Sequence, residues 1–211
     1  RVAAGGCAPC LSSSAPLSQA YNVTESHEPN PVAADLDGDG ALELLYSSYD
    51  GRVHAFWLDK TEHGAWPYSV YSAAEGTLRF ASEPTVADLD NDGHAEVIFA
   101  SWTQKGSNKT GKLNILDYLG HVLQEVSLPA AFGSPDWNGA LAAPTLADID
   151  GDPDLEVVLN TAHSGLVAYE LPGTAGARLL WHTGRANYQR DAFVPPGPYQ
   201  PNQSILPLIW K

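Results

Sequence analysis

The sequence predicts an all-β fold of the β-propeller kind, from its composition and from a threefold internal repeat. The chain has 211 residues, 44% of them hydrophobic, which is long enough for one domain with a substantial core. It contains 19 glycines and 16 prolines but only 17% charged residues. This composition is typical of short strands joined by turns. No stretch of the length of an ordinary helix carries the i, i+3, i+4, i+7 apolar pattern without glycine or proline, so no long helix is expected.

The internal repeat begins at three prolines, Pro31, Pro84 and Pro144. Each starts the pattern Pro-x-x-Ala-Asp-x-Asp-x-Asp, and a glutamate follows eight residues after the first aspartate. The first aspartates are 53 and 60 residues apart, a period that suits one propeller blade. After the acidic loop, each repeat continues with a short apolar run, a glycine turn and an alternating strand. A weaker fourth strand is expected at 68–71, 122–128 and 178–181, and four antiparallel strands form one blade.

These repeats divide the chain into five parts. They are an N-terminal segment 1–29, three repeats 30–83, 84–143 and 144–183, and a proline-rich C-terminal segment 184–211. Four blades are the usual minimum for a closed propeller, and the two end segments together are about as long as one repeat. Two arrangements are therefore compatible with the sequence: the ends pair into a fourth, metal-free blade, or the three blades form an open arc completed by another chain or by more of a longer protein. The C-terminal segment ends in an apolar run, which we expect to pack on this domain or on a partner.

The acidic loops have the chemistry of calcium sites, because Ca²⁺ prefers six to eight hard oxygen ligands. Loop positions 1, 3 and 5 are aspartates, position 7 offers a backbone carbonyl and position 9 is a glutamate. The predicted ligands of loop 1 (35–43) are Asp35, Asp37, Asp39, Ala41 and Glu43. Those of loop 2 (88–96) are Asp88, Asp90, Asp92, His94 and Glu96. Those of loop 3 (148–156) are Asp148, Asp150, Asp152, Asp154 and Glu156.

Two other kinds of metal site, an EF-hand and a magnesium site, fit these loops less well. An EF-hand needs a glutamate at position 12, where this chain has Tyr46, Phe99 and Leu159. A site with this many carboxylates suits the larger calcium ion better than magnesium. Loop 3 has Pro153 where the other loops have glycine, so we expect loop 3 to bind more weakly.

The loops also explain the net charge of −14. Positions 1, 3, 5 and 9 of the three loops hold twelve of the 25 carboxylates, and the rest of the chain has 13 acidic against 11 basic residues. Without a metal, four carboxylates within nine residues would repel one another. The acidity therefore indicates metal sites, and it excludes nucleic-acid binding, which needs a basic surface.

The pattern Pro-x-x-Ala-Asp-Leu-Asp-x-Asp-Gly-x-x-Glu resembles the FG-GAP/VCBS repeat family, whose calcium loops are similar to those of the integrin α-subunit propeller. The resemblance covers about residues 30–183. The segment from Trp181 to Arg190 also resembles one that often follows the last such repeat in bacterial secreted proteins. The resemblance implies a propeller with up to three structural Ca²⁺ ions, at the cell surface or outside the cell. It implies no single activity, because the family includes adhesion modules, ligand-binding domains and domains attached to enzymes.

The cysteines and tryptophans leave alternatives open. Cys7 and Cys10 are interpreted as a local disulfide formed in an oxidising compartment, with cross-chain pairing or a redox role as alternatives. Aromatic rings near strand connections either contact a sugar or protein partner or fill gaps between blades. The residues concerned are Trp57, Trp66, Trp102 and Trp137.

Three functions compete. The first is a non-catalytic extracellular module that binds a protein or glycan partner. The second is a structural subunit of a surface filament or appendage, which would assemble through exposed strand edges or the C-terminal tail. The third is a calcium-dependent polysaccharide lyase or hydrolase, although no catalytic residue is predicted because no nucleophile elbow, zinc-binding histidine spacing or phosphate loop occurs. No apolar run is long enough to predict a membrane span.

Overall fold

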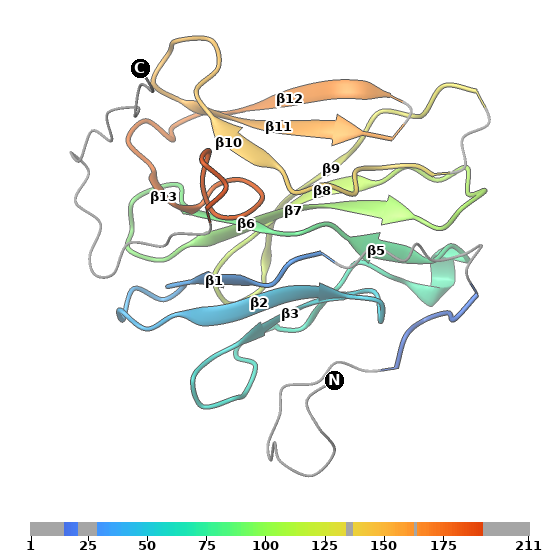
Figure 1. Ribbon diagram of the computed structural model, residues 1–211, viewed down its shortest axis with the longest axis horizontal. Helices are drawn as coiled ribbons and strands as arrows, with labels where there is room; N and C mark the ends of the chain where they lie inside the picture. Colours follow the sequence, from blue (N-terminus) through green and yellow to red (C-terminus); the bar gives the residue numbers. More distant parts are fainter. Residues whose placement is uncertain (1–14, 21–28, 134–136, 163, 192–211) are drawn as a thin grey trace.

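The protein is all-β, as predicted. The computed structural model describes residues 15–20, 29–133, 137–162 and 164–191. Within these ranges the only helix is a 3-10 turn, Ala73–Glu75. The strands form antiparallel sheets that lie over one another as three layers (Figure 1). Cys7, Cys10 and most of the two end segments lie outside the described residues, so the predicted disulfide and the packing of the tail stay predictions.

The first sheet contains the first repeat in the simple order β1-β2-β3-β4. Its strands are β1 (Val32–Ala34), β2 (Glu43–Ser48), β3 (Arg52–Phe56) and β4 (Tyr68–Ser69). Alternate residues of β2 are buried, which is the period of two expected for a strand with one face on a core. The predicted fourth strand is present but is only two residues long.

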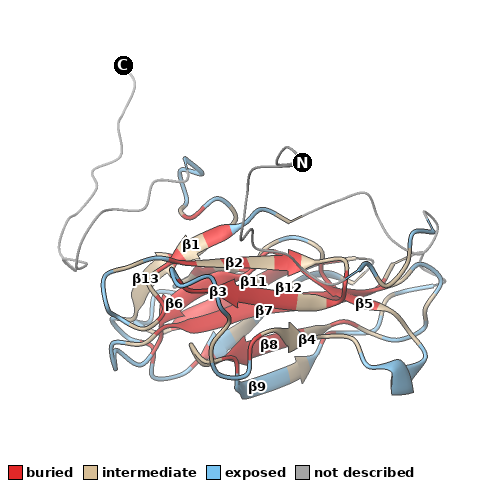
Figure 2. Ribbon diagram, turned by 90° about the horizontal axis from the view of Figure 1, so that it is seen from below, coloured by how far each residue is buried: buried red, intermediate tan, exposed pale blue. Residues whose placement is uncertain are grey.

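The central sheet contains the second repeat in the order β6-β7-β8-β9, together with two strands from outside this repeat. Its strands are β6 (Thr85–Asp88), β7 (Glu96–Thr103), β8 (Lys112–Leu116), β9 (Val122–Ser127), β5 (Arg79–Ala81) paired to β7, and β13 (Arg178–Trp181) paired to β6. All eight residues of β7 are buried, because this strand has a layer on each side. By contrast, β9 is mostly exposed at the outer edge (Figure 2).

The third sheet has three strands, β10 (Thr145–Ala147), β11 (Leu155–Thr161) and β12 (Gly165–Leu171). A fourth strand does form at 178–181, as predicted, but it pairs with β6 of the central sheet and not with β12. Trp181 of this strand is buried in the core between the first two sheets, and its indole N–H lies 3.4 Å from Glu83 Oε1. These contacts explain why the strand leaves its own repeat. Among the described residues, β12 consequently has no strand on its outer edge.

The hydrophobic core has two parts, one on each face of the central sheet. Val97 and Phe99 of β7 pack with Leu45 and Val53 of the first sheet. Ile98 and Ala100, which alternate with them along β7, pack toward the third sheet in the second cluster. Because both faces of β7 are buried, loop 2 leads directly into a strand that the core holds on both sides. No helix in the described part of the chain is long and apolar enough to cross a membrane.

Candidate metal centres

Each acidic loop joins the first two strands of its repeat. Loop 1 connects β1 to β2, loop 2 connects β6 to β7, and loop 3 connects β10 to β11. The alanine before the first aspartate always pairs with the position-9 glutamate. The three pairs are Ala34 with Glu43, Ala87 with Glu96, and Ala147 with Glu156. The sequence repeat therefore corresponds to a repeated strand register.

The same hydrogen bonds recur inside all three loops. The position-9 glutamate accepts a hydrogen bond of 2.7 Å at Oε2 from the position-2 backbone N–H, which belongs to Leu36, Leu89 and Ile149. The position-5 N–H donates to the position-3 aspartate at 3.1–3.3 Å. The position-7 N–H donates to the position-5 aspartate at 2.7–2.9 Å. Hydrogen bonds from backbone N–H groups therefore fix the orientation of these carboxylate groups.

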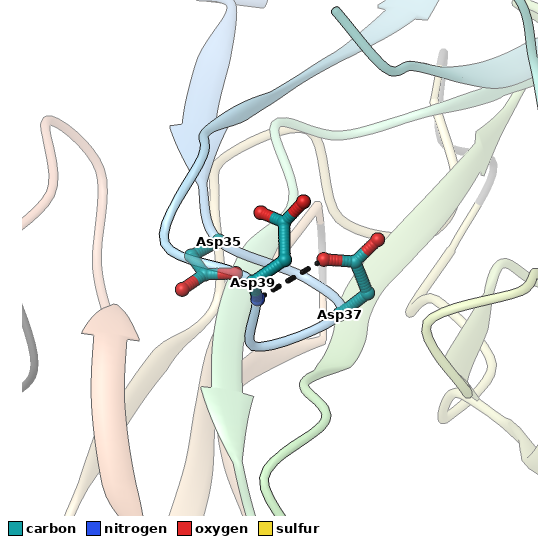
Figure 3. Close-up of side chains that lie close together, drawn as sticks. All are labelled: Asp35, Asp37 and Asp39. Carbon is teal, nitrogen blue, oxygen red and sulfur yellow. Dashed lines mark hydrogen bonds between the residues drawn. The ribbon is translucent and has the colours of Figure 1, made fainter.

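Carboxylate oxygens come together in every loop, at distances that suit a single metal ion. In loop 1, oxygens of Asp35, Asp37 and Asp39 lie within 4.8 Å of one another (Figure 3). The corresponding group in loop 2 is Asp88, Asp90 and Glu96. Loop 3 has two groups that share one residue, namely Asp148 with Asp150 and Glu156, and Asp150 with Asp152 and Glu170.

Not every predicted ligand belongs to these groups. Glu43 and Asp92 lie outside the groups of their loops. The backbone carbonyls of Ala41, His94 and Asp154 remain predicted ligands. The Asp154 carboxylate accepts hydrogen bonds from Gly173 and Ala175 and so stabilises the turn after β12.

The electrostatics of the loops favour a cation. The pKa of Glu43 is raised to about 7, mainly by burial and also by the three aspartates of loop 1, while the hydrogen bond from Leu36 acts in the opposite direction. The pKa of Glu96 is raised to about 7 by the same causes in loop 2. Asp88 and Glu156 are only 3% and 4% exposed, yet Asp88 Oδ1 and Glu156 Oε1 have no hydrogen-bond partner among the residues that the structure describes. Buried, unpaired anionic oxygens are costly unless a cation compensates them, so these residues fit a hard divalent metal.

Loops 1 and 2 contact each other directly. The backbone N–H of Ala95 donates to the carbonyl oxygen of Leu36 at 2.8 Å, and His94 Nδ1 lies 3.1 Å from the carbonyl oxygen of Asp37. Gly38 has φ +75°, and a Cβ at this position would lie 2.4 Å from the carbonyl oxygen of Gly93. Glycine at 38 therefore permits both the turn and the close approach of the two loops.

Several residues of these centres were not apparent from the sequence. Trp57 donates its indole N–H to Asp37 Oδ2 at 2.8 Å. Arg178 of β13 places Nε 3.5 Å from Asp88 Oδ2. The third is Glu170 of β12, whose pKa is raised to about 7 by desolvation and by the carboxylates of loop 3. The contact of each residue with its loop depends on how the strands pair, which the sequence does not state. The alternating strands that end near Trp57 and Glu170 were the one feature of the sequence that pointed to these positions.

The tryptophans support the gap-filling interpretation. Trp57, Trp66 and Trp102 are at most 8% exposed. Trp66 donates to the carbonyl oxygen of Tyr118, which belongs to the next repeat, at 2.9 Å. Trp137 is half-buried and packs edge-on against Trp102. These side chains mainly join neighbouring sheets.

Comparison with known proteins finds one family model that spans the first two loops. Residues 35–99 match the family model of an FG-GAP-like repeat. The matched segment begins at the first aspartate of loop 1 and ends just after loop 2, so it contains both contacting loops. A search of curated proteins and of solved structures found no match.

Proposed function

We propose that this chain, which carries an FG-GAP-like repeat, is a calcium-stabilised, propeller-type module that acts outside the cell as a non-catalytic binding unit. The observation that carries the proposal is the identical register and hydrogen bonding of three acidic loops. The aspartates and the position-9 glutamate of each loop would hold Ca²⁺. The ion would supply two positive charges that offset half of the charge of the four ligand carboxylates in each loop.

The role of calcium in this proposal is structural. Position 12 of loops 2 and 3 is Phe99 and Leu159, and both side chains are at most 1% exposed in the core. A metal bound at such a loop would fix the junction between two strands, the second of which continues directly into the hydrophobic core. Calcium modules outside the cell commonly have Kd values of about 10⁻⁴–10⁻³ M, which suits a permanent structural ion in a calcium-rich medium.

For the partner we propose a protein or a glycan. A polar cavity of about 110 Å³ lies between the first and central sheets and is lined in part by Tyr68, Tyr71, Lys112, Asn114 and Glu125. Lys112 Nζ lies 2.8 Å from Glu125 Oε1, so these two charges are paired. Paired charges, an amide and hydroxyl groups beside aromatic rings suit a neutral polyol better than an ion.

Thermal unfolding in EDTA, in Ca²⁺ and in Mg²⁺ tests the calcium part. Ca²⁺ at 100 times its Kd should contribute about 2.7 kcal/mol for each site that binds only the folded state. At about 2–4 °C per kcal/mol for a chain of this size, even one site raises Tm by roughly 5–11 °C. Mg²⁺ should raise Tm less. An unchanged Tm after EDTA treatment would rule out structural calcium.

A glycan array tests the binding part, with an Asn114→Ala variant as the matched control. A neutral oligosaccharide that binds the wild type and not the variant would support the cavity as a glycan site. If no glycan binds, a protein partner remains the proposal, and pull-down with the calcium-loaded and EDTA-treated forms should then retain a partner only with calcium.

The second candidate is a structural subunit that assembles through a strand edge. It is favoured by the outer edge of β12, which no other described strand covers, and by Leu166 on that strand, which is 72% exposed. Free strand edges promote pairing with another chain. Sedimentation should then show concentration-dependent association that a Val167→Pro change in β12 removes, whereas a monomer at all concentrations would count against assembly.

A further inference from the structure

The three repeats carry different residues at one structurally equivalent position, at the end of the third strand. In each repeat, the residue immediately after the position-9 glutamate pairs with the third strand of that repeat. The three pairs are Leu44 with Phe56, Val97 with Leu116, and Val157 with Tyr169. The residue that follows the paired one is Trp57 in repeat 1, Asp117 in repeat 2 and Glu170 in repeat 3. This position lies beside the metal loop of its own repeat.

The three residues at this position do different things. Trp57 donates a hydrogen bond to Asp37 of loop 1. Asp117 uses its carboxylate to close its own turn, because it accepts from the backbone N–H groups of Leu119 and His121 at 2.9 and 2.8 Å. Glu170 instead turns toward loop 3, where its oxygen lies within 4.8 Å of oxygens from Asp150 and Asp152.

Glu170 also stands directly opposite Glu156 in the pairing of β11 with β12. Two like charges directly opposite each other destabilise a sheet. The Glu156 side chain is buried, at 4% exposure, and within the described part of the chain no donor group forms a hydrogen bond with its Oε1. A buried carboxylate oxygen of this kind is costly unless it is compensated by a proton shared with Glu170 or by a bound cation. The further acidic oxygens of Asp150 and Asp152 beside Glu170 favour the cation.

We propose that Glu170 is a fifth carboxylate ligand of the metal at loop 3, supplied by the neighbouring strand. Loop 3 would then differ from loops 1 and 2, which draw their carboxylates from the loop alone. This inference rests on the proposed calcium binding and adds a residue that the loop pattern does not contain. It also offsets the effect of Pro153, because the number of charged ligands strongly influences the Kd of calcium loops.

The experiment is a calorimetric Ca²⁺ titration of the wild type and of Glu170→Gln, each after EDTA treatment and dialysis. The substitution keeps the size of an exposed side chain, so folding is expected to be preserved. One of three sites should lose roughly tenfold or more in affinity, since one charged ligand is removed. Asp117→Asn, at the equivalent position in repeat 2, is the matched control and should leave all Ca²⁺ affinities unchanged.

A second measurement separates a ligand from a merely structural residue. In EDTA, Glu170→Gln should unfold at the same or a higher temperature than the wild type, because the repulsion from Glu156 is removed. In Ca²⁺ it should gain less in Tm than the wild type gains. Unchanged Ca²⁺ affinities in the variant, or a lower Tm in EDTA with an unchanged gain in Ca²⁺, would overturn the assignment of Glu170. If the wild type binds no Ca²⁺, the proposed function fails and this inference fails with it. If only the inference fails, the Glu170→Gln variant still binds Ca²⁺ at three sites with the affinities of the wild type.

Discussion

Replacing the position-9 glutamates of loops 1 and 2 by glutamine should stabilise the metal-free protein at neutral pH. Glutamine has nearly the shape of a protonated glutamate, and its amide oxygen can still accept the hydrogen bond that Leu36 gives to Glu43. The same holds for Leu89 and Glu96 in loop 2. The double variant Glu43→Gln, Glu96→Gln therefore removes two buried charges and keeps the local hydrogen bonds.

The magnitude follows from the raised pKa values. For both glutamates the pKa rises from 4.5 to about 7 in the folded protein, so the folded state binds the proton more tightly than the unfolded state. The stabilisation is complete below pH 4.5 and is lost as the pH rises through 7. At 1.36 kcal/mol per pH unit, this amounts to about 3.4 kcal/mol per residue. Halving this figure for solvent around the exposed loop aspartates leaves about 1.7 kcal/mol per residue.

The assay is urea unfolding in EDTA at several pH values between 5 and 7.5. The wild type should lose stability across this range relative to the double variant, and the variant should be more stable at pH 7.5 by about 3 kcal/mol. Burial lowers the pKa of His182, which gives the opposite slope within the same range. That contribution is the same in both proteins and cancels in the difference. In saturating Ca²⁺ the order should reverse, because the variant has lost two charged ligands.

Two results would refute this reasoning. One is a double variant that is less stable than the wild type at pH 7.5 in EDTA. The other is a stability difference that does not change between pH 5 and 7.5. Either result would mean that the position-9 glutamates are compensated without a metal.

Two further predictions concern loops 1 and 2. Gly38→Ala should lower Tm and weaken Ca²⁺ binding at both loops, because its Cβ would meet the Gly93 carbonyl oxygen. Gly40→Ala, at φ +88° with open space around the Cβ, should cost only the roughly 1 kcal/mol of left-handed strain, and equal losses in the two variants would disprove the loop contact. Arg178→Gln should destabilise the metal-free protein and raise the affinity of loop 2 several-fold, because a positive charge 3.5 Å from Asp88 competes with a cation. A calorimetric titration that shows unchanged affinity would exclude this competition.

Local sequence was enough to predict the loops and most strands. The acidic loops begin and end where the repeat pattern places them, because turn residues and strand formers act over a few neighbouring positions. The predicted fourth strands appear at 68–69, 122–127 and 178–181. The family match at 35–99 agrees with the quoted pattern in the first two repeats.

The pairing partners could not be predicted in the same way. The alternating pattern at 178–181 indicates a strand but does not say which edge it joins. Its place beside β6 depends on burial of Trp181 against the first sheet. Glu170 was missed for a related reason, since its approach to loop 3 depends on the register of β12 against β11. The contact between Gly38 and Gly93 depends on how two sheets stack, and no short segment encodes that.

The central claim is that the three loops bind calcium, and counting the bound ions tests it most directly. The EDTA-treated protein would be dialysed against about 10 mM Ca²⁺, roughly tenfold above the upper end of the Kd range for extracellular modules, so that every site is nearly saturated. Bound calcium would then be measured by atomic emission against protein concentration. We predict three calcium ions per chain, one for each loop. No bound calcium above the dialysis buffer would contradict the account.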